Sequence, residues 1–237
     1  MRQTLFFRPN FLRQLRAAMK FQIIPVTPFQ QNCTLMWDEN TNKAAVVDPG
    51  GDIEKISDAL NQRNLTLEKV FVTHGHLDHC GGARKLADLY NVPIEGPNQE
   101  DAWLLEQLNS DQTRMWGLPP GEPFTPDRWL NQGDNVTVGN ETLQVFHCPG
   151  HSPGHVVFFH APTKVAISGD VLFAGSVGRT DLPKGSFKAL ENPSGKTCIN
   201  WGTMYSLYRD TAQSLPLVRN GVAMPSSGTR INLYKKR

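Results

Sequence analysis

The sequence has few cysteines and no long apolar run. Among its 237 residues only Cys33, Cys80, Cys148 and Cys198 carry thiols, and no two of them form a CxxC pair. This scatter argues against a disulfide framework and favours the reducing cytoplasm. No apolar run approaches the roughly 20 residues that a membrane-spanning helix needs. The composition therefore predicts a cytoplasmic protein with no membrane partner.

Acidic residues are nearly absent from both ends of the chain. Residues 1–18 contain four arginines and no acid, and residues 193–237 contain seven lysines or arginines and one acid. Of the 24 basic and 22 acidic residues in the whole chain, residues 19–192 therefore hold 13 and 21, a formal net charge of −8. Because this acidic body has no basic stripe, no nucleic-acid partner is expected. The basic ends suit either tails that bind a partner or segments foreign to the domain.

The leader, residues 1–18, has the arginine-rich composition of an organelle-targeting peptide but lacks the apolar stretch of a secretory signal. Met19 then opens a strand-like segment, which favours Met19 as the natural start. We therefore expect a non-native or disordered leader at 1–18 and one folded domain at 19–192. The chain's hydrophobic fraction of 39% is sufficient for a single core.

Hydrophobic periodicity predicts a chain of strands interrupted by helices. Ile53, Ile56 and Leu60 recur at helical spacing, with Asp52 as a plausible N-cap. A polar segment rich in proline and glycine at 117–135 reads as a surface loop. No solenoid repeat is present, and the order of elements predicts a layered α/β domain. The predicted helices are 52–63, 81–90 and 98–109, and the predicted strands are 21–26, 33–37, 44–47, 70–72, one within 91–96, 136–138, 142–146, 155–159 and 165–168.

A dense group of potential metal ligands follows the predicted strand at 70–72. The segment THGHLDH places His74, His76, Asp78 and His79 within six consecutive residues. Imidazole nitrogens bind Zn²⁺ or Fe²⁺ well, and a carboxylate adds an oxygen ligand. A polar loop without a metal is the alternative, but four ligand-type side chains in so short a stretch favour a metal site.

Two further strand ends offer ligands of the same kind. FHCPGHSPGH supplies His147, His151 and His155 after the strand at 142–146, and its Pro-Gly turn can present His151. Asp170 ends another apolar strand in AISGDVLF. Ligands at three strand ends are expected of a site built along one edge of a sheet.

Three motifs in combination resemble the metallo-β-lactamase-fold hydrolases. They are THGHLDH at 73–79, CPGHSPGH at 148–155 and SGDVLF at 168–173. DPGG at 48–51 and SVGRTDLPKG at 176–185 are similar to one branch, the short bacterial glyoxalase II-like (hydroxyacylglutathione hydrolase) proteins. The resemblance covers roughly residues 19–192 and implies an αββα sandwich.

The resemblance also implies a ligand set for two metal ions, expected to be zinc, with iron or manganese as alternatives. By position, His74, His76 and His151 would bind one ion. Asp78 and His79 would bind a second, and Asp170 would bridge the two. Asp48 would lie behind the ligands, where a carboxylate can orient a ligand histidine. His147 and His155 have no ligand role in the family, so we expect them to be packed or hydrogen-bonded.

The implied activity is cleavage of a small-molecule thioester of the S-lactoylglutathione type by a metal-bound hydroxide. Asp78 could accept a proton as well as bind metal. Arg179 could hold an acidic substrate tail, or it could form an ion pair with Asp181. An alternative is a persulfide dioxygenase of the same fold with one iron ion. A second alternative is an inactive product of a damaged reading frame.

The sequence lacks one ligand of the family pattern. That pattern requires a further histidine in a Pro-Gly-His-Gly stretch, but no histidine follows His160. Shifting the codons by one base permits Leu-Gly-Asp-Asp-Val across residues 200–205 and Pro-Gly-His-Gly-Pro-Ile across 208–214, strings that resemble the missing end. We therefore expect 193–237 to be a frame-shifted tail, the fold to be incomplete there, and each chain to hold one metal ion or fewer. A natural tail that binds a partner is the alternative.

Overall fold

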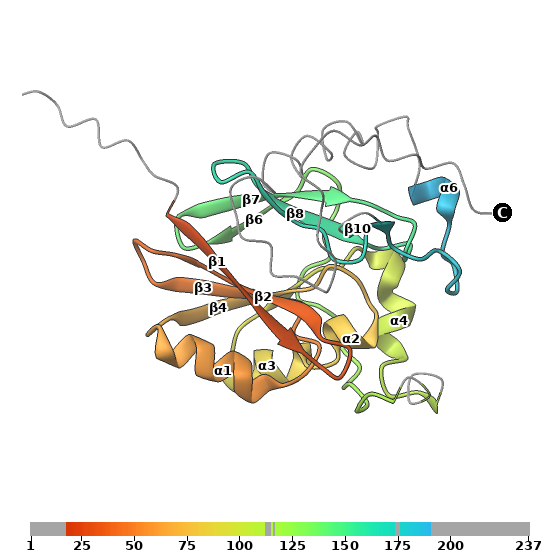
Figure 1. Ribbon diagram of the computed structural model, residues 1–237, viewed down its shortest axis with the longest axis horizontal. Helices are drawn as coiled ribbons and strands as arrows, with labels where there is room; N and C mark the ends of the chain where they lie inside the picture. Colours follow the sequence, from red (N-terminus) through yellow and green to blue (C-terminus); the bar gives the residue numbers. More distant parts are fainter. Residues whose placement is uncertain (1–17, 112–114, 116, 174–175, 191–237) are drawn as a thin grey trace, which may run out of the picture.

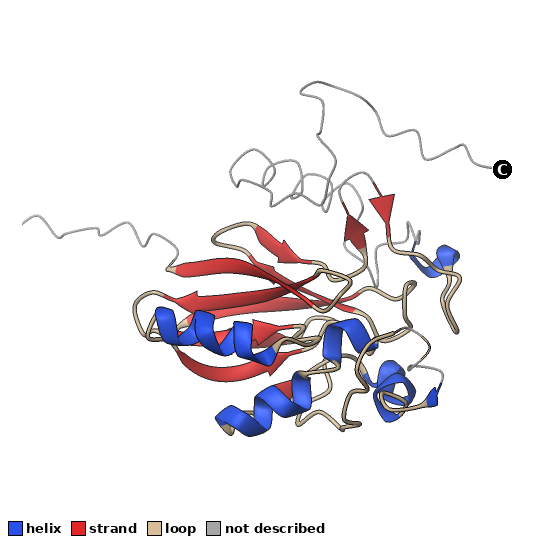
Figure 2. Ribbon diagram, turned by 60° about the horizontal axis from the view of Figure 1, so that its bottom comes forward, coloured by secondary structure: helices blue, strands red, loops and turns tan. Residues whose placement is uncertain are grey.

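Two β-sheets pack face to face, and helices cover the outer face of one of them (Figures 1 and 2). The computed structural model describes residues 18–111, 115, 117–173 and 176–190. The predicted tail at 193–237 lies outside this range, as does the predicted leader except for Ala18. Ala18 is buried and donates its backbone N–H to Glu141 Oε1 at 3.0 Å. None of the described helices is both long and apolar enough to cross a membrane.

The first sheet has five strands in the order β1-β2-β3-β4-β5. The three N-terminal strands pair antiparallel, whereas β3, β4 and β5 run parallel, so helices must connect the parallel strands. These helices are α1 and α3, with the short α2 following β4. The bounds are β1 Met19–Val26, β2 Gln31–Asp38, β3 Lys43–Val47, α1 Ile53–Gln62, β4 Thr66–Phe71, α2 Leu77–Cys80, α3 Ala83–Tyr90 and β5 Ile94–Glu95.

The second sheet is an antiparallel meander of four strands in chain order. Two short helical segments, η1 and α4, connect the first sheet to it, and a small hairpin and helix follow. The bounds are η1 Gln99–Asp101, α4 Ala102–Glu106, β6 Asn135–Val138, β7 Glu141–His147, β8 Val156–His160, β9 Val165–Ile167, β10 Leu172–Phe173, β11 Ser176–Val177 and α6 Phe187–Leu190.

The apolar faces of the two sheets meet in one buried cluster. Phe71 of β4 stacks on Phe158 of β8 with ring centroids 5.2 Å apart, and both rings are fully buried. Met36 and Val47 from the first sheet and Val145 from the second belong to the same cluster. Burial of these side chains holds the two sheets together, and with them the loops at their edges.

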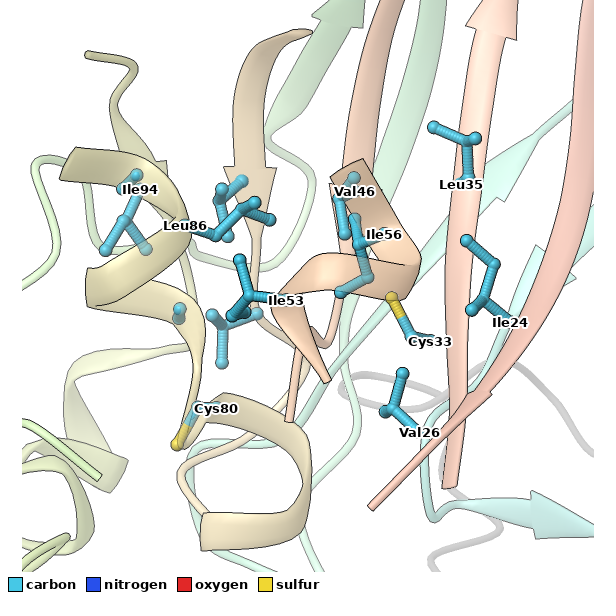
Figure 3. Close-up of a cluster of buried hydrophobic side chains, with 14 of the residues drawn as sticks. Ile24, Val26, Cys33, Leu35, Val46, Ile53, Ile56, Cys80, Leu86 and Ile94 are labelled. Atoms are coloured by element: carbon cyan, nitrogen blue, oxygen red, sulfur yellow. The ribbon is translucent and has the colours of Figure 1, made fainter. Parts of the chain in front are cut away.

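Another buried apolar core lies between the first sheet and its helices (Figure 3). Ile53 and Ile56 of α1 and Leu86 of α3 point toward Val46 of β3. Leu60 is buried in the same cluster, so the helical spacing of Ile53, Ile56 and Leu60 buries one face of α1 as predicted.

The predicted α/β domain is confirmed, and the described residues form its helix, sheet and sheet layers. Two local details differ from the predictions. Asp52 occupies the N-cap position of α1 as predicted, but its side chain makes no capping bond and accepts instead from the Thr27 N–H and the Lys55 ammonium. The helix predicted at 98–109 begins as a 3₁₀ turn, and its α-helical part ends at Glu106.

Candidate metal centre

The predicted ligands lie in three segments, each following a strand. After β4, a loop carries His74 and His76 and the short helix α2 carries Asp78 and His79. The loop after β7 carries His151, and the turn after β9 carries Asp170. The structure brings all six side chains together. They form two adjoining groups, described here as the three-histidine cluster and the second cluster.

The three-histidine cluster consists of His74, His76 and His151. One ring nitrogen of each lies within 4.8 Å of those of the other two. His76 Nδ1 is 2.9 Å from His151 Nε2, and the rings of His74 and His76 meet edge to face. At this distance the two nitrogens can either share a proton in a hydrogen bond or both bind one cation, so the geometry is compatible with a metal ion.

Acceptors behind two of these rings fix which nitrogen faces the cluster. His151 Nδ1 lies 2.8 Å from the backbone oxygen of Arg179, so an N–H there leaves Nε2 to face His76. Thr73 Oγ donates to Asp48 Oδ2 at 2.6 Å and can therefore accept from His74 Nδ1 at 3.0 Å. His74 Nε2 is then a buried lone pair, and it has no hydrogen-bond partner within the described part of the chain. An orphaned buried nitrogen of this kind is what a metal ion would satisfy.

The protonation of these rings also suits metal binding. Burial and the neighbouring histidines lower the pKa of His74 well below its usual value. Burial, followed by the nearby His151, lowers the pKa of His76 to about 3. Only a neutral imidazole can bind a metal, so both rings are in the required form at neutral pH.

The second cluster consists of Asp78, His79 and Asp170. His79 Nε2 lies 3.2 Å from Asp170 Oδ1 and 3.7 Å from Asp78 Oδ2. The other oxygen of Asp170, Oδ2, lies 3.3 Å from His151 Nε2. Asp170 thus presents one oxygen to each cluster, which is the geometry of a bridging ligand.

His79 lies between carboxylates on both sides. Burial opposes its protonation, but hydrogen bonds to Asp170 and Asp48 outweigh burial and raise the pKa of His79 well above its usual value. Burial likewise opposes ionisation of Asp170, and the hydrogen bond from His79 outweighs it and holds the pKa of Asp170 below its usual range. The second cluster therefore attracts positive charge, which a metal cation can supply.

Asp48 lies behind the ligands, as predicted. It also forms a compact donor group with His74 and His79. However, its two oxygens accept from the backbone N–H and the hydroxyl of Thr73 at 2.7 and 2.6 Å and lie 2.9 Å from His79 Nδ1. These contacts occupy its lone pairs and aim His79 Nε2 at the second cluster, so the geometry favours an orienting role over a ligand role.

His147 and His155 are hydrogen-bonded, as predicted. His147 Nε2 lies 2.8 Å from the backbone oxygen of Pro153, away from the clusters. His155 is closer to the site than the sequence suggested. Its Nε2 accepts the backbone N–H of Asp170 at 3.0 Å, and its ring stacks on His74 with centroids 4.5 Å apart.

A cavity of about 240 Å³ opens beside the two clusters. His76, Asp78, His151 and Asp170 contribute polar groups to its lining, and Arg179 contributes a cation. Both roles considered for Arg179 have structural support, because its guanidinium also forms two hydrogen bonds of 2.8 and 2.7 Å with Asp181. The remaining lining is mainly apolar and includes Phe29, Leu77, Trp103, Leu104, Leu118, Leu182 and Pro183.

The sequence pattern of the Metallo-beta-lactamase superfamily matches residues 26–209, more than half of the chain. The chain belongs to this superfamily. Membership confirms the predicted fold family and the prediction of a metallo-hydrolase, and the fold implies binding of divalent metal.

Several known proteins are similar to this chain over most of its length. Hydroxyacylglutathione hydrolase GloC of Haemophilus influenzae is 45% identical over 173 residues, which are 73% of this chain and 81% of the relative. Among solved structures, the BLEG-1 B3 metallo-beta-lactamase has a TM-score of 0.66 and 34% identity, covering 72% of this chain and 81% of that one. TTHA1623 in a di-iron-bound form has a TM-score of 0.64 and 31% identity, covering 79% and 86%.

Sequence reasoning missed three residues that support the site. Thr73 joins Asp48 to His74, and Gln31 Nε2 lies 3.1 Å from His79 Nδ1. Asp101 hydrogen-bonds to both histidine-bearing loops. Gln31 and Asp101 lie outside the ligand-type motifs, and Thr73 lies within one but is not itself a typical ligand. No local pattern therefore marks these residues in a single sequence.

Proposed function

We propose that this protein is a metal-dependent thioester hydrolase that cleaves a glutathione thioester of the S-lactoylglutathione type. The observation that carries the proposal is the convergence of six potential ligands into two clusters at the wall of one cavity. The 45% identity to a hydroxyacylglutathione hydrolase supports the choice of thioester. Cys33 and Cys80 are buried and form no disulfide, and the cytoplasm is the location that we propose.

The chain's own residues would divide the work. His74, His76 and His151 would hold one ion, Asp78 and His79 a second, and Asp170 both. When bound, such ions lower the pKa of water to about 7 and polarise a carbonyl, with zinc as the proposed metal and iron or manganese as alternatives.

Asp78 lines the cavity, where its carboxylate would take up a proton during hydrolysis. Arg179 would orient the substrate by binding a carboxylate of the glutathione moiety. The apolar lining would exclude water from the rest of the thioester. A thiolate is a good leaving group, so no strong general acid is required.

The proposal is tested with purified protein loaded with Zn²⁺. Loss of the thioester absorbance of S-lactoylglutathione should depend on protein concentration and disappear after chelation. His151→Ala should abolish this activity, whereas His147→Ala, a matched control at the end of β7, should retain it. Retained activity in His151→Ala would contradict the proposed role of the clusters.

Two further measurements separate the alternatives. Oxygen uptake with glutathione persulfide and Fe²⁺, without thioester loss, would instead identify a dioxygenase. Cleavage of a chromogenic β-lactam but not of the thioester would identify a lactamase. Inactivity of the metal-loaded chain, together with activity after the shifted reading frame is restored, would identify a damaged gene product.

A further inference from the structure

Asp101 is a fully buried carboxylate at the end of η1, and it is not among the residues that line the cavity. No lysine or arginine of the described chain pairs with it. Instead, three neutral donors satisfy it. Oδ2 accepts the backbone N–H of Gly75 at 2.9 Å and the hydroxyl of Ser152 at 2.7 Å, and Oδ1 accepts the backbone N–H of Gly154 at 2.6 Å. An ion buried in this way requires all of these bonds.

Every one of these donors is next in sequence to a histidine of the site. Gly75 lies between His74 and His76, on the loop after β4. Ser152 follows His151, and Gly154 precedes His155, both on the loop after β7. One carboxylate therefore joins the two loops that together form the three-histidine cluster. The link is short on both sides, so a movement of either loop would stretch it.

The packing around Asp101 leaves these loops little freedom. A Cβ added to Gly154 would lie 2.6 Å from Asp101 N and 2.7 Å from its Cγ, and a Cβ on Gly75 would lie 2.6 Å from Leu104 Cβ. The backbone of Gly154 also accepts the N–H of Asn98 at 3.0 Å. Both glycines thus allow η1 and α4 to approach the loops closely enough for a carboxylate to reach their N–H groups.

We infer that Asp101 is a positioning residue, which sets the distance between the two loops and thereby the geometry of the His74, His76 and His151 cluster. The inference rests on the metal centre of the proposed function. Asp101 touches neither the cavity nor a ligand side chain, and it acts through the backbone of Gly75 and Gly154 and the hydroxyl of Ser152. Replacement of its carboxylate by an amide would turn an NH₂ group toward at least one of these donors.

Asp38 offers a matched control for such a replacement. It is also fully buried, and it accepts the backbone N–H groups of Asn40 and Asn140 at 2.9 and 3.0 Å and the Thr41 hydroxyl at 2.8 Å. It ends β2, whereas Gln31, which contacts His79, begins that strand, about 23 Å away at the usual rise per residue. Asp38 and Asp101 therefore share their chemistry but differ in distance from the histidines.

The experiment compares Asp101→Asn with Asp38→Asn in the full chain. Zn²⁺ affinity is measured by competition with a chromophoric chelator, the site geometry by the absorption spectrum of the Co²⁺-loaded protein, and stability by thermal unfolding without metal. We expect both variants to unfold at lower temperature. Only Asp101→Asn should weaken Zn²⁺ binding, by about 10- to 100-fold, and alter the Co²⁺ spectrum.

Unchanged Zn²⁺ affinity and an unchanged Co²⁺ spectrum in Asp101→Asn would overturn the inference and leave the proposed function standing. Equal losses of affinity in both variants would also overturn it, because they would reflect stability alone. If the wild-type chain binds no Zn²⁺, both the inference and the proposed function fail. Should Asp101→Asn not fold, Ser152→Ala removes one of the three bonds, and it must show the same spectral change in a smaller degree for the inference to hold.

Discussion

At the residue scale, the orientation of one ring decides whether the second cluster can bind a metal. His79 contacts Asp48 through Nδ1 and Asp170 of the second cluster through Nε2. Replacing Asp48 with Asn should turn an NH₂ group toward one of the donors that now hold the carboxylate. We expect Asp48→Asn to weaken metal binding by about 10- to 100-fold, the usual effect of losing such a partner. Chelator competition measures this change.

Asp52→Asn is the matched control for Asp48→Asn. Asp52 also has a left-handed backbone and accepts a backbone N–H, from Thr27, but it contacts no ligand. Its replacement should leave the metal affinity unchanged. An equal loss in both variants would show that Asp48 acts through the stability of the 48–52 turn and not through His79.

A second prediction at this scale concerns Arg179. Arg179 lines the cavity, and its guanidinium already pairs with Asp181, so a substrate would compete with Asp181 for it. Arg179→Gln should raise KM for a glutathione thioester and leave kcat nearly unchanged, because it removes binding that is the same in the ground and transition states. Asp181→Asn should lower KM by releasing the guanidinium. Steady-state kinetics measures both effects.

The control for Arg179 is the exposed Lys188 on α6. Lys188→Gln removes the same charge outside the cavity and should not change KM. A thioester without carboxylates should also be insensitive to Arg179→Gln. If Arg179→Gln leaves KM for the glutathione thioester at the wild-type value, the ion pair with Asp181 is its only role.

The potential ligands that converge in the structure could be selected from the sequence because each lies in a short motif of ligand-type residues. His74, His76, Asp78 and His79 form such a motif, and their convergence follows from one strand and one turn. Thr73 and Asp101 could not be predicted in the same way. Their partners are distant in sequence: Thr73 bonds to Asp48, 25 positions away, and the partners of Asp101 lie up to 53 residues away.

At the element scale, the turn between β3 and α1 sets the position of α2. A Cβ on Gly50 would lie 1.6 Å from the backbone oxygen of Asp78, and Gly82 donates its N–H to Pro49 O at 2.9 Å. Gly50→Ala must therefore displace α2, which carries Asp78 and His79. We expect it to lower the free energy of unfolding by about 1–3 kcal/mol, as overpacking does, and to weaken metal binding. Chemical denaturation with and without Zn²⁺ tests both effects.

Gly51→Ala controls for the loss of a glycine in the same turn. The nearest atom to its added Cβ is the side-chain Cγ2 of Thr27 at 3.2 Å, which can move by the few tenths of an ångström required. This variant should be close to the wild type in stability and in Zn²⁺ affinity. If Gly50→Ala matches Gly51→Ala, the turn does not fix the position of α2.

Periodicity predicted the elements better than their ends. The spacing of Ile53, Ile56 and Leu60 was sufficient for α1, because burial of one face is what stabilises that helix. Asp52 was predicted as its cap from residue type alone. The contacts with Thr27 and Lys55 that draw its carboxylate away could not be seen in the sequence, since one of them bridges 25 positions.

At the scale of the whole molecule, the packing of the two sheets explains why separate motifs form one site. Phe71 ends β4 just before the first histidine loop, and Phe158 in β8 follows the second. Their stacked rings fix the sheets so that the loops after β4, β7 and β9 meet. Hydrophobic periodicity predicted the strands, but the pairing of Phe71 with Phe158 depends on register and sheet-to-sheet packing, which a local pattern does not contain.

The last prediction follows from the positions of all seven histidines in the chain. His74, His76 and His151 form one cluster, His155 accepts the Asp170 N–H, and His147 and His160 bond to Pro153 and Glu141 elsewhere. Only His79 remains for the second cluster, so carboxylates must supply its other side-chain ligands. We expect at most one Zn²⁺ ion per chain to stay bound through gel filtration, and a moderate chelator to remove any ion from the second cluster.

Elemental analysis after gel filtration, with and without the chelator, measures this stoichiometry. We propose that 193–237 is a frame-shifted tail, and a variant with the shifted frame restored supplies the comparison. That variant gains a histidine in Pro-Gly-His-Gly and should retain two ions, because a fourth protein ligand strengthens the weaker site. Two ions held equally tightly by the chain as it stands would contradict both the histidine assignment and the proposed origin of the tail.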